Sequence, residues 1–150
     1  MEGALAEAFD DRVIGHLFEA GAIRYTIPAR TARYTPDFFV RRDRDIVQPL
    51  PDNWYQDEAW WAEHFVIESK GQFFSDDRKK HVLIKKQYPM SDVRFIFDRN
   101  VRKDGTLGSG SGSHSLISKG AKTRISEWCV KNGFLYADNT VPNSWFDSDD

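Results

Sequence analysis

Two short apolar segments of this chain carry charged residues where a strand in a folded core would bury its side chains. The segment YTPDFFV covers residues 34–40, and the segment FVIESKG covers residues 65–71. Asp37 lies in the first segment, and Glu68 and Lys70 lie in the second. Burying an isolated carboxylate is very costly unless the group is paired or bound to a metal. The chain therefore has to fold so that these charged groups find partners, and this requirement is the strongest constraint on its fold.

The length and composition of the chain indicate one domain over residues 1–150. Of its 150 residues, 40% are hydrophobic and 14% are aromatic, which is enough for an ordinary core. The single cysteine, Cys129, excludes an intramolecular disulfide and is best explained by core packing; an acidic N-terminus without a long apolar run is not a secretory signal. We therefore expect an intracellular protein. The formal net charge of −2 neither requires nor excludes a nucleic-acid partner, because the clustering of basic residues matters more.

Hydrophobic periodicity predicts a mixture of helices and strands. The predicted helices cover residues 4–20, 75–89 and 122–133, with Gly133 as the C-cap of the last one. The predicted strands cover residues 23–27, 29–40, 64–71 and 93–98, with a short extended piece at 134–138. This order predicts an α/β fold with a mixed central sheet flanked by helices.

The helix predicted over residues 75–89 has clear terminal signals. Ser75 can cap its N-terminus, and Pro89 lies beyond its end. The apolar residues expected on its inward face are Val82, Leu83 and Tyr88, with Ile84 near the edge of that face.

Three segments depart from this regular pattern. Residues 41–64 contain two prolines and three tryptophans, and we interpret them as a long insertion between two strands of a hairpin, with a short helix at 56–63. The insertion is either a functional lid or a loop whose tryptophans pack on the domain, and the second interpretation is preferred. Residues 105–115 have the composition of a flexible Gly/Ser loop, natural or not, and residues 147–150 form an acidic tail.

The charged residues in the two strands have the chemistry of a metal site. Glu68 and Lys70 are two residues apart, so their side chains leave the same face of the strand, where Asp37 could join them. Carboxylates bind Mg²⁺, which lowers the pKa of a bound water and neutralises charge on a phosphate. A lysine can orient that water or stabilise the developing negative charge, and the combination suits phosphodiester hydrolysis. The alternative is a surface salt bridge between Lys70 and one of the acids on an edge strand.

A basic helix follows the second strand and would lie beside this site. Its positive face is where the phosphates of a polyanion would bind. The alternative is an ordinary solvated helix whose lysines pair with Asp76 and Asp77, and His81 alone is more typical of a helix surface than of a ligand. The candidates for phosphate contact are Arg78, Lys79, Lys80, His81, Lys85, Lys119 and Lys122.

The motifs YTPDF, ESKG, SDDRKKH, SKGAKT, EWCVKNGF and ADNTVP occur in this order. This arrangement resembles the endonuclease I of T-seven-like bacteriophages, a family of four-way (Holliday) junction resolvases in the PD-(D/E)xK nuclease superfamily. The resemblance covers about residues 5–146 and implies a restriction-endonuclease-like core. It also implies an intertwined, domain-swapped homodimer, in which the N-terminal helix (1–22) of one subunit completes the active site of the other. The connecting bridge would be residues 27–34.

The resemblance also implies roles for individual residues. Asp37, Glu68 and Lys70 match the catalytic carboxylates and lysine of the family, and the backbone carbonyl of Ser69 would be a further metal ligand. The family takes one more acidic residue from its first helix, which corresponds here to Asp10, although the family has the longer glutamate there. The alternatives at this position are Asp11 and Glu7.

We therefore expect a deoxyribonuclease that resolves four-way junctions with Mg²⁺, with Mn²⁺ able to substitute and two ions per site. Its partners would be branched DNA and a second copy of the chain, without a membrane, in the cytoplasm of the infected bacterial host. Selectivity would come from the shape and deformability of the junction. The alternatives are a nuclease of the same fold that acts on linear duplex DNA and a non-catalytic DNA-binding module.

Overall fold

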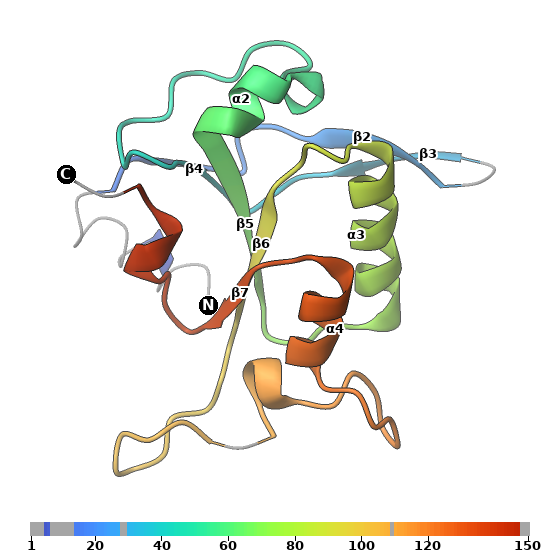
Figure 1. Ribbon diagram of the computed structural model, residues 1–150, viewed down its shortest axis with the longest axis vertical. Helices are drawn as coiled ribbons and strands as arrows, with labels where there is room; N and C mark the ends of the chain where they lie inside the picture. Colours follow the sequence, from blue (N-terminus) through green and yellow to red (C-terminus); the bar gives the residue numbers. More distant parts are fainter. Residues whose placement is uncertain (1–4, 7–13, 28–29, 109, 148–150) are drawn as a thin grey trace.

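The computed structural model describes residues 5–6, 14–27, 30–108 and 110–147 of the chain. Its centre is a mixed five-stranded sheet (Figure 1). The strands of the sheet, in spatial order, are β1 (His16–Phe18), β4 (Phe38–Arg41), β5 (His64–Lys70), β6 (Val93–Phe97) and β7 (Tyr136–Asp138). β1 pairs with β4 and β4 with β5 in antiparallel fashion, whereas β5, β6 and β7 run parallel. The predicted α/β class and mixed central sheet are confirmed.

The other elements lie around this sheet or in a separate hairpin. None of the helices in the described part of the chain is long and apolar enough to cross a membrane. The helices are α2 (Glu58–Glu63), α3 (Ser75–Gln87) and α4 (Ile125–Asn132), and the 3-10 turns are η1 (Trp54–Gln56), η2 (Gly112–His114) and η3 (Asn143–Trp145). The hairpin consists of β2 (Ile23–Ile27) and β3 (Arg30–Tyr34).

β5 is the central strand, and its side chains contribute to both halves of the core. Because alternate residues of a strand point to opposite faces, Val66 packs in one apolar cluster and Ile67 in another. Ile84 of α3 and Cys129 of α4 are buried with Val66, so Cys129 is a core residue, as predicted. The helices α3 and α4 lie on this side of the sheet, and the C-terminal segment with η3 lies on the other (Figure 1).

α3 and α4 were both predicted, but the inward face of α3 was only partly assigned, because Leu83 and Tyr88 pack against the core as expected and Val82 does not. Val82 is 40% exposed, whereas Ile84 and His81 are buried. The two most deeply buried side chains of the helix, His81 and Ile84, are three residues apart, and one of them is a histidine. Ser75 is the first residue of the helix, not its cap, and the backbone N–H of Phe74 donates to Asp77 Oδ2 at 3.2 Å. Gly133 follows α4 with φ 76°, which confirms the predicted C-cap.

The predicted N-terminal helix is wrong over its last residues. The residues 16–18 form β1, which pairs with β4. This pairing gives hydrogen-bond partners to the edge of β4 that faces away from β5. A Cβ at Gly15 would lie 2.6 Å from the Cα of Ile46, so this close backbone approach requires glycine. Leu5 is buried against the core, and most of the remaining predicted helix lies outside the described residues.

The described residues of the segment 27–34, which was predicted to bridge two subunits, are extended but pair within this chain. β2 and β3 are antiparallel, with Ile23 opposite Tyr34 and Ile27 opposite Arg30. The hairpin lies against the end of α3, where the backbone of Thr26 exchanges two hydrogen bonds with the side chain of Gln87. In this single chain the hairpin therefore belongs to the same folding unit as the sheet.

The insertion 41–64 packs on the domain, as preferred from the sequence. Its tryptophans are buried in the cluster around Val66, and the ring of Trp54 meets Phe39 at 5.1 Å. Its short helix is α2, and the side chain of Asp57 caps it by accepting from Ala59 N at 2.9 Å.

The Gly/Ser segment also packs on the domain in its described C-terminal part. Ser113 is buried, and its hydroxyl donates to Asp138 Oδ2 at 2.7 Å. Gly112 has φ 54°, and a Cβ there would lie 2.6 Å from the Cβ of Arg99. A composition typical of linkers therefore serves close packing at these residues. Of the predicted acidic tail, only Asp147 lies within the described residues.

Candidate active site

The register of β4 and β5 brings two buried carboxylates face to face. Phe38 lies opposite Ile67, so one further step along the antiparallel pair places Asp37 opposite Glu68. Strand alternation directs both side chains to the face of the sheet that α3 covers. Each residue is only 6% exposed. Because β5 has a neighbouring strand on each side, the alternative is wrong in placing the salt bridge on an edge strand, although Lys70 and Glu68 do form an ion pair.

Each carboxylate has hydrogen-bond donors on one of its two oxygens. Asp37 Oδ2 accepts from the backbone N–H and the hydroxyl of Ser69, at 2.9 and 3.1 Å. Glu68 Oε2 accepts from the hydroxyl of Tyr34 at 2.7 Å. These donors hold one oxygen of each head group in place.

Lys70 completes the cluster from the same strand. Its Nζ lies 3.6 Å from Glu68 Oε1 and 3.1 Å from Asp77 Oδ1 at the first turn of α3. Burial lowers the pKa of Lys70, but the two carboxylates outweigh burial, so the pKa is raised overall. Lys70 is therefore positively charged at neutral pH and suits electrostatic stabilisation better than proton abstraction.

The surroundings of Glu68 disfavour its ionised form more than the nearby positive charges favour it. Burial raises its pKa to about 7, and the neighbouring Asp37 adds to the rise, while Tyr34 and Lys70 only partly oppose it. Two buried carboxylates, of which burial disfavours the charged form of Glu68, are a donor set that fits a divalent cation with hard oxygen ligands. Among the described residues no group of three or more histidine, cysteine or acidic side chains could hold a metal. The predicted third carboxylate, Asp10, lies outside the described residues, as do its alternatives.

Comparison with known proteins supplies independent evidence about this chain. The family model for phage endonuclease I matches residues 43–150. Over 142 residues the chain is 33% identical to "Endodeoxyribonuclease 1" of Enterobacteria phage T3, which covers 95% of this chain and 71% of the relative. Over 145 residues it is 30% identical to "Endonuclease I" of Escherichia phage T7, which covers 97% of this chain and 74% of that relative. The chain belongs to the phage endonuclease I family. The resemblance seen in the sequence motifs is thereby confirmed.

In this endonuclease I family member, His81 is buried and does not lie on the helix surface as predicted. It is 1% exposed, and its ring meets those of Tyr34 and Phe95 edge-on at 4.9 and 4.8 Å. Neither ring nitrogen has a hydrogen-bond partner among the described residues. Burial, with the positive charge of Lys80, holds the pKa of His81 well below its usual range. The prediction of a surface histidine that contacts phosphate is therefore wrong, and His81 is a neutral core residue beneath Tyr34.

The other basic candidates divide into engaged and free side chains. Lys85 Nζ donates to the carbonyl of Gly133 at 2.9 Å, and Lys80 Nζ lies 5.0 Å from the ring centre of Tyr34. Arg78 donates to two backbone carbonyls. The exposed candidates, which keep their charges in solvent, are Lys79, Lys119 and Lys122.

Several residues at or near the site were not predicted from the sequence. Tyr34 and Asp77 contact the catalytic candidates directly, and a signal for Tyr34 existed, because a buried tyrosine hydroxyl needs a partner. Three exposed arginines of the β2–β3 hairpin were also missed. Arg24 lies directly opposite Arg33, and Arg30 lines a cavity of about 410 Å³ together with Lys79 and Lys80. The missed arginines are Arg24, Arg30 and Arg33.

Proposed function

We propose that this protein is a metal-dependent DNA endonuclease that cuts four-way junctions and other branched DNA. Membership of the phage endonuclease I family supports a nuclease, and the relative in phage T3 is named an endodeoxyribonuclease. The observation that carries the proposal is the buried pair of Asp37 and Glu68 beside Lys70. A restriction-endonuclease-like arrangement of the core is part of the same proposal.

The residues of the cluster would divide the catalytic work. Asp37, Glu68 and the backbone carbonyl of Ser69 would hold Mg²⁺, with Asp10 as the further carboxylate. Bound Mg²⁺ lowers the pKa of a water ligand and neutralises charge on a phosphate oxygen. Lys70, kept charged by Glu68 and Asp77, would stabilise the negative charge that develops on the phosphate. Mn²⁺ binds the same oxygen donors, so it should substitute for Mg²⁺. Each site would hold two ions.

We also propose a homodimer with shared active sites, acting in the cytoplasm of the infected host. Domain swapping exchanges identical elements between subunits, so each element makes the same contacts with the partner subunit as it would make within its own chain. The pairing of β2 with β3 could form between two chains as it does within one. Two sites related by a two-fold axis would suit paired incisions across a branch point.

Cleavage of a four-way junction and of a sequence-matched linear duplex tests the proposal. We expect the wild type to cut the junction only when Mg²⁺ is present and to prefer it over the duplex. Glu68→Ala and Lys70→Ala should each lower cutting by at least about a hundredfold. Equal cutting of both DNAs would favour the duplex nuclease, binding without any cutting would favour the non-catalytic module, and undiminished cutting by both variants would refute the site assignment.

A further inference from the structure

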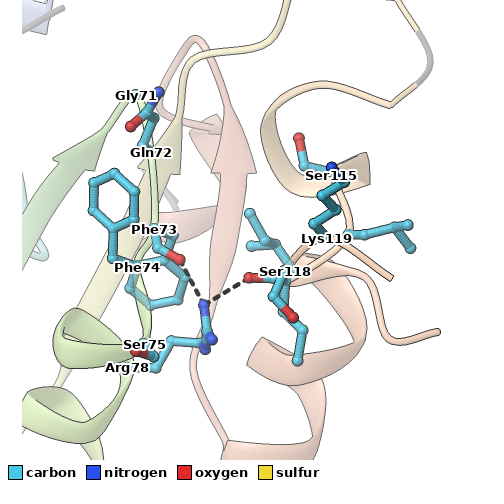
Figure 2. Close-up of a pocket in the computed structure, with 12 residues that line it drawn as sticks. Gly71, Gln72, Phe73, Phe74, Ser75, Arg78, Ser115, Ser118 and Lys119 are labelled. Carbon is cyan, nitrogen blue, oxygen red and sulfur yellow. Dashed lines mark hydrogen bonds between the residues drawn. The ribbon is translucent and has the colours of Figure 1, made fainter. Parts of the chain in front are cut away.

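A second cavity lies beyond the C-terminal end of β5, where the chain passes from Lys70 into α3. It has a volume of about 470 Å³ and opens between two loops (Figure 2). One wall is the segment 71–75, which continues directly from Lys70 into α3, and the other wall is the segment 115–119. The lining of the cavity therefore begins at Gly71, the residue that follows Lys70 in the chain.

Arg78 connects the two walls of the cavity. Its Nη1 donates to the carbonyl of Phe73 at 2.6 Å and to the carbonyl of Ile117 at 2.9 Å (Figure 2). No carboxylate within the described part of the chain forms a salt bridge with Arg78 or with the exposed Lys119 on the opposite wall. The cavity therefore carries two positive charges without internal neutralisation, which favours an anionic occupant.

The cavity also presents apolar surface, which an anion alone would not need. Phe74 lines it and is 62% exposed, and Leu116 on the facing wall is also exposed. The backbone at Phe74 is held, because its N–H donates to Asp77 Oδ2 and its carbonyl accepts from Arg78 N at 3.1 Å. The aromatic ring thus projects from a fixed helix start.

We propose that this cavity binds an unpaired nucleobase of branched DNA, stacked on Phe74, with its phosphate near Arg78 and Lys119. The proposal rests on the proposed function and specifies how that function selects its substrate. Every base has a face that stacks on an aromatic ring, and its sugar-phosphate backbone supplies the negative charge. Base pairing is weakest at a branch point, so an unpaired base is obtained there at a lower cost than within a duplex. Occupation of the cavity would therefore favour junctions over linear DNA.

Binding and photocrosslinking in EDTA, where the DNA stays intact, test this proposal. In a four-way junction with 5-iodouracil at the point of strand exchange, we expect irradiation to crosslink the base to Phe74, as identified by mass spectrometry. Phe74→Ala should raise the Kd for the junction about tenfold and the Kd for a matched duplex by less than about twofold. Phe74→Trp should keep the affinity of the wild type.

Val130→Ala is the matched control, because Val130 is 70% exposed on α4 and lies outside the cavity. It should bind both DNAs like the wild type, and thermal unfolding should show that every variant is folded. An unchanged Kd for Phe74→Ala, or an equal loss on junction and duplex, would overturn the proposal. If the wild type cuts junctions while Phe74→Ala binds them normally, only the base site is refuted. If the wild type cuts no junction with Mg²⁺, the proposed function itself is refuted.

Discussion

At the scale of single residues, the environment of Glu68 has the largest electrostatic consequence. Its carboxyl is buried opposite Asp37, and its pKa of about 7 lies above the ordinary value of 4.5. The folded chain therefore keeps a proton that the unfolded chain releases between pH 4.5 and about 7. The free energy of unfolding must fall as the pH rises through this window. A bound cation would reverse this effect, because it stabilises the ionised form.

Glu68→Gln should therefore stabilise the metal-free protein at pH 8 and have little effect at pH 4. One pKa unit corresponds to about 1.4 kcal/mol, so the gain at pH 8 is of the order of 3 kcal/mol. Thermal unfolding across this pH range in EDTA measures it, and the exposed Glu58→Gln serves as the control. Addition of Mg²⁺ should raise the Tm of the wild type at pH 8 and leave that of Glu68→Gln unchanged. Equal metal responses would contradict a role for Glu68 in metal binding.

Tyr34 should position Glu68 without taking part in the chemistry. Tyr34→Phe removes the hydroxyl that donates to Glu68 Oε2. Because a hydrogen bond to a charged group contributes about 1.5–3 kcal/mol, we expect at least about a tenfold loss in the rate of junction cutting. The acid limb of the pH–rate profile should also move to higher pH, since the hydrogen bond from Tyr34 lowers the pKa of Glu68. Tyr25→Phe, a nearby buried tyrosine of β2, is the matched control, and an identical loss there would point to a general packing effect.

The carboxylate pair could be predicted from the sequence, but the residues that support it could not. Asp37, Glu68 and Lys70 could be placed on one face because strand alternation is a local rule. The contact between Tyr34 and Glu68 depends on how the hairpin packs against the sheet, which no local pattern encodes. His81 failed for a similar reason, since the histidine lies among charged residues in the sequence but faces the sheet in the fold.

At the scale of elements, the β2–β3 hairpin carries an unfavourable arrangement of charge. Arg24 and Arg33 are exposed and directly opposed across the two strands. Like charges in such a pair destabilise a hairpin, whereas an anion between them relieves the repulsion. Together with the basic residues that line the neighbouring cavity, the pair extends the positive surface from α3 onto the hairpin.

Arg33→Glu should therefore change stability and DNA binding in opposite directions. Replacement of the repulsive pair by an attractive one should stabilise the protein by about 0.5 kcal/mol. The same change should weaken DNA binding and reduce the slope of log K against log salt by about 1, because one phosphate contact is lost. Urea denaturation and binding titrations at several salt concentrations measure the two effects. Lys131→Glu, an exposed change on α4, controls for net charge, and an equal loss of affinity there would argue against the hairpin as a DNA contact.

Elements with one strong local pattern were predicted well, and elements shaped by distant contacts were not. α3, α4 and the buried strands β5 and β6 follow from periodicity and flanking turn residues. The segment 16–18 has apolar residues that fit a helix or an edge strand equally well. The choice depends on pairing with β4 and on the close approach at Gly15. Similarly, the composition of residues 105–115 indicates flexibility, whereas Gly112 and Ser113 are packed against β7.

At the scale of the whole molecule, the topology collects the candidate site from distant parts of the chain. Tyr34 and Asp37 come from the region of β3 and β4, Glu68 and Lys70 from β5, and Asp77 from α3. The long insertion between β4 and β5 does not disturb their register, because its tryptophans fill the core beside it. The third carboxylate proposed for the site, Asp10, would come from the partner subunit if the dimer exchanges its N-terminal segments.

Subunit mixing tests this exchange directly. Glu68→Ala and Asp10→Ala should each be inactive alone. In a swapped heterodimer of the two, one site carries both substitutions and the other carries neither, so one site is restored. With random assortment about a quarter of the wild-type sites should reappear after the two variants are refolded together.

A supercoiled plasmid with an extruded cruciform should then be nicked to open circles, whereas the wild type should produce linear DNA by paired cuts. If the sites are not shared, each site in the heterodimer keeps one substitution, and refolded mixtures should remain as inactive as the separate variants.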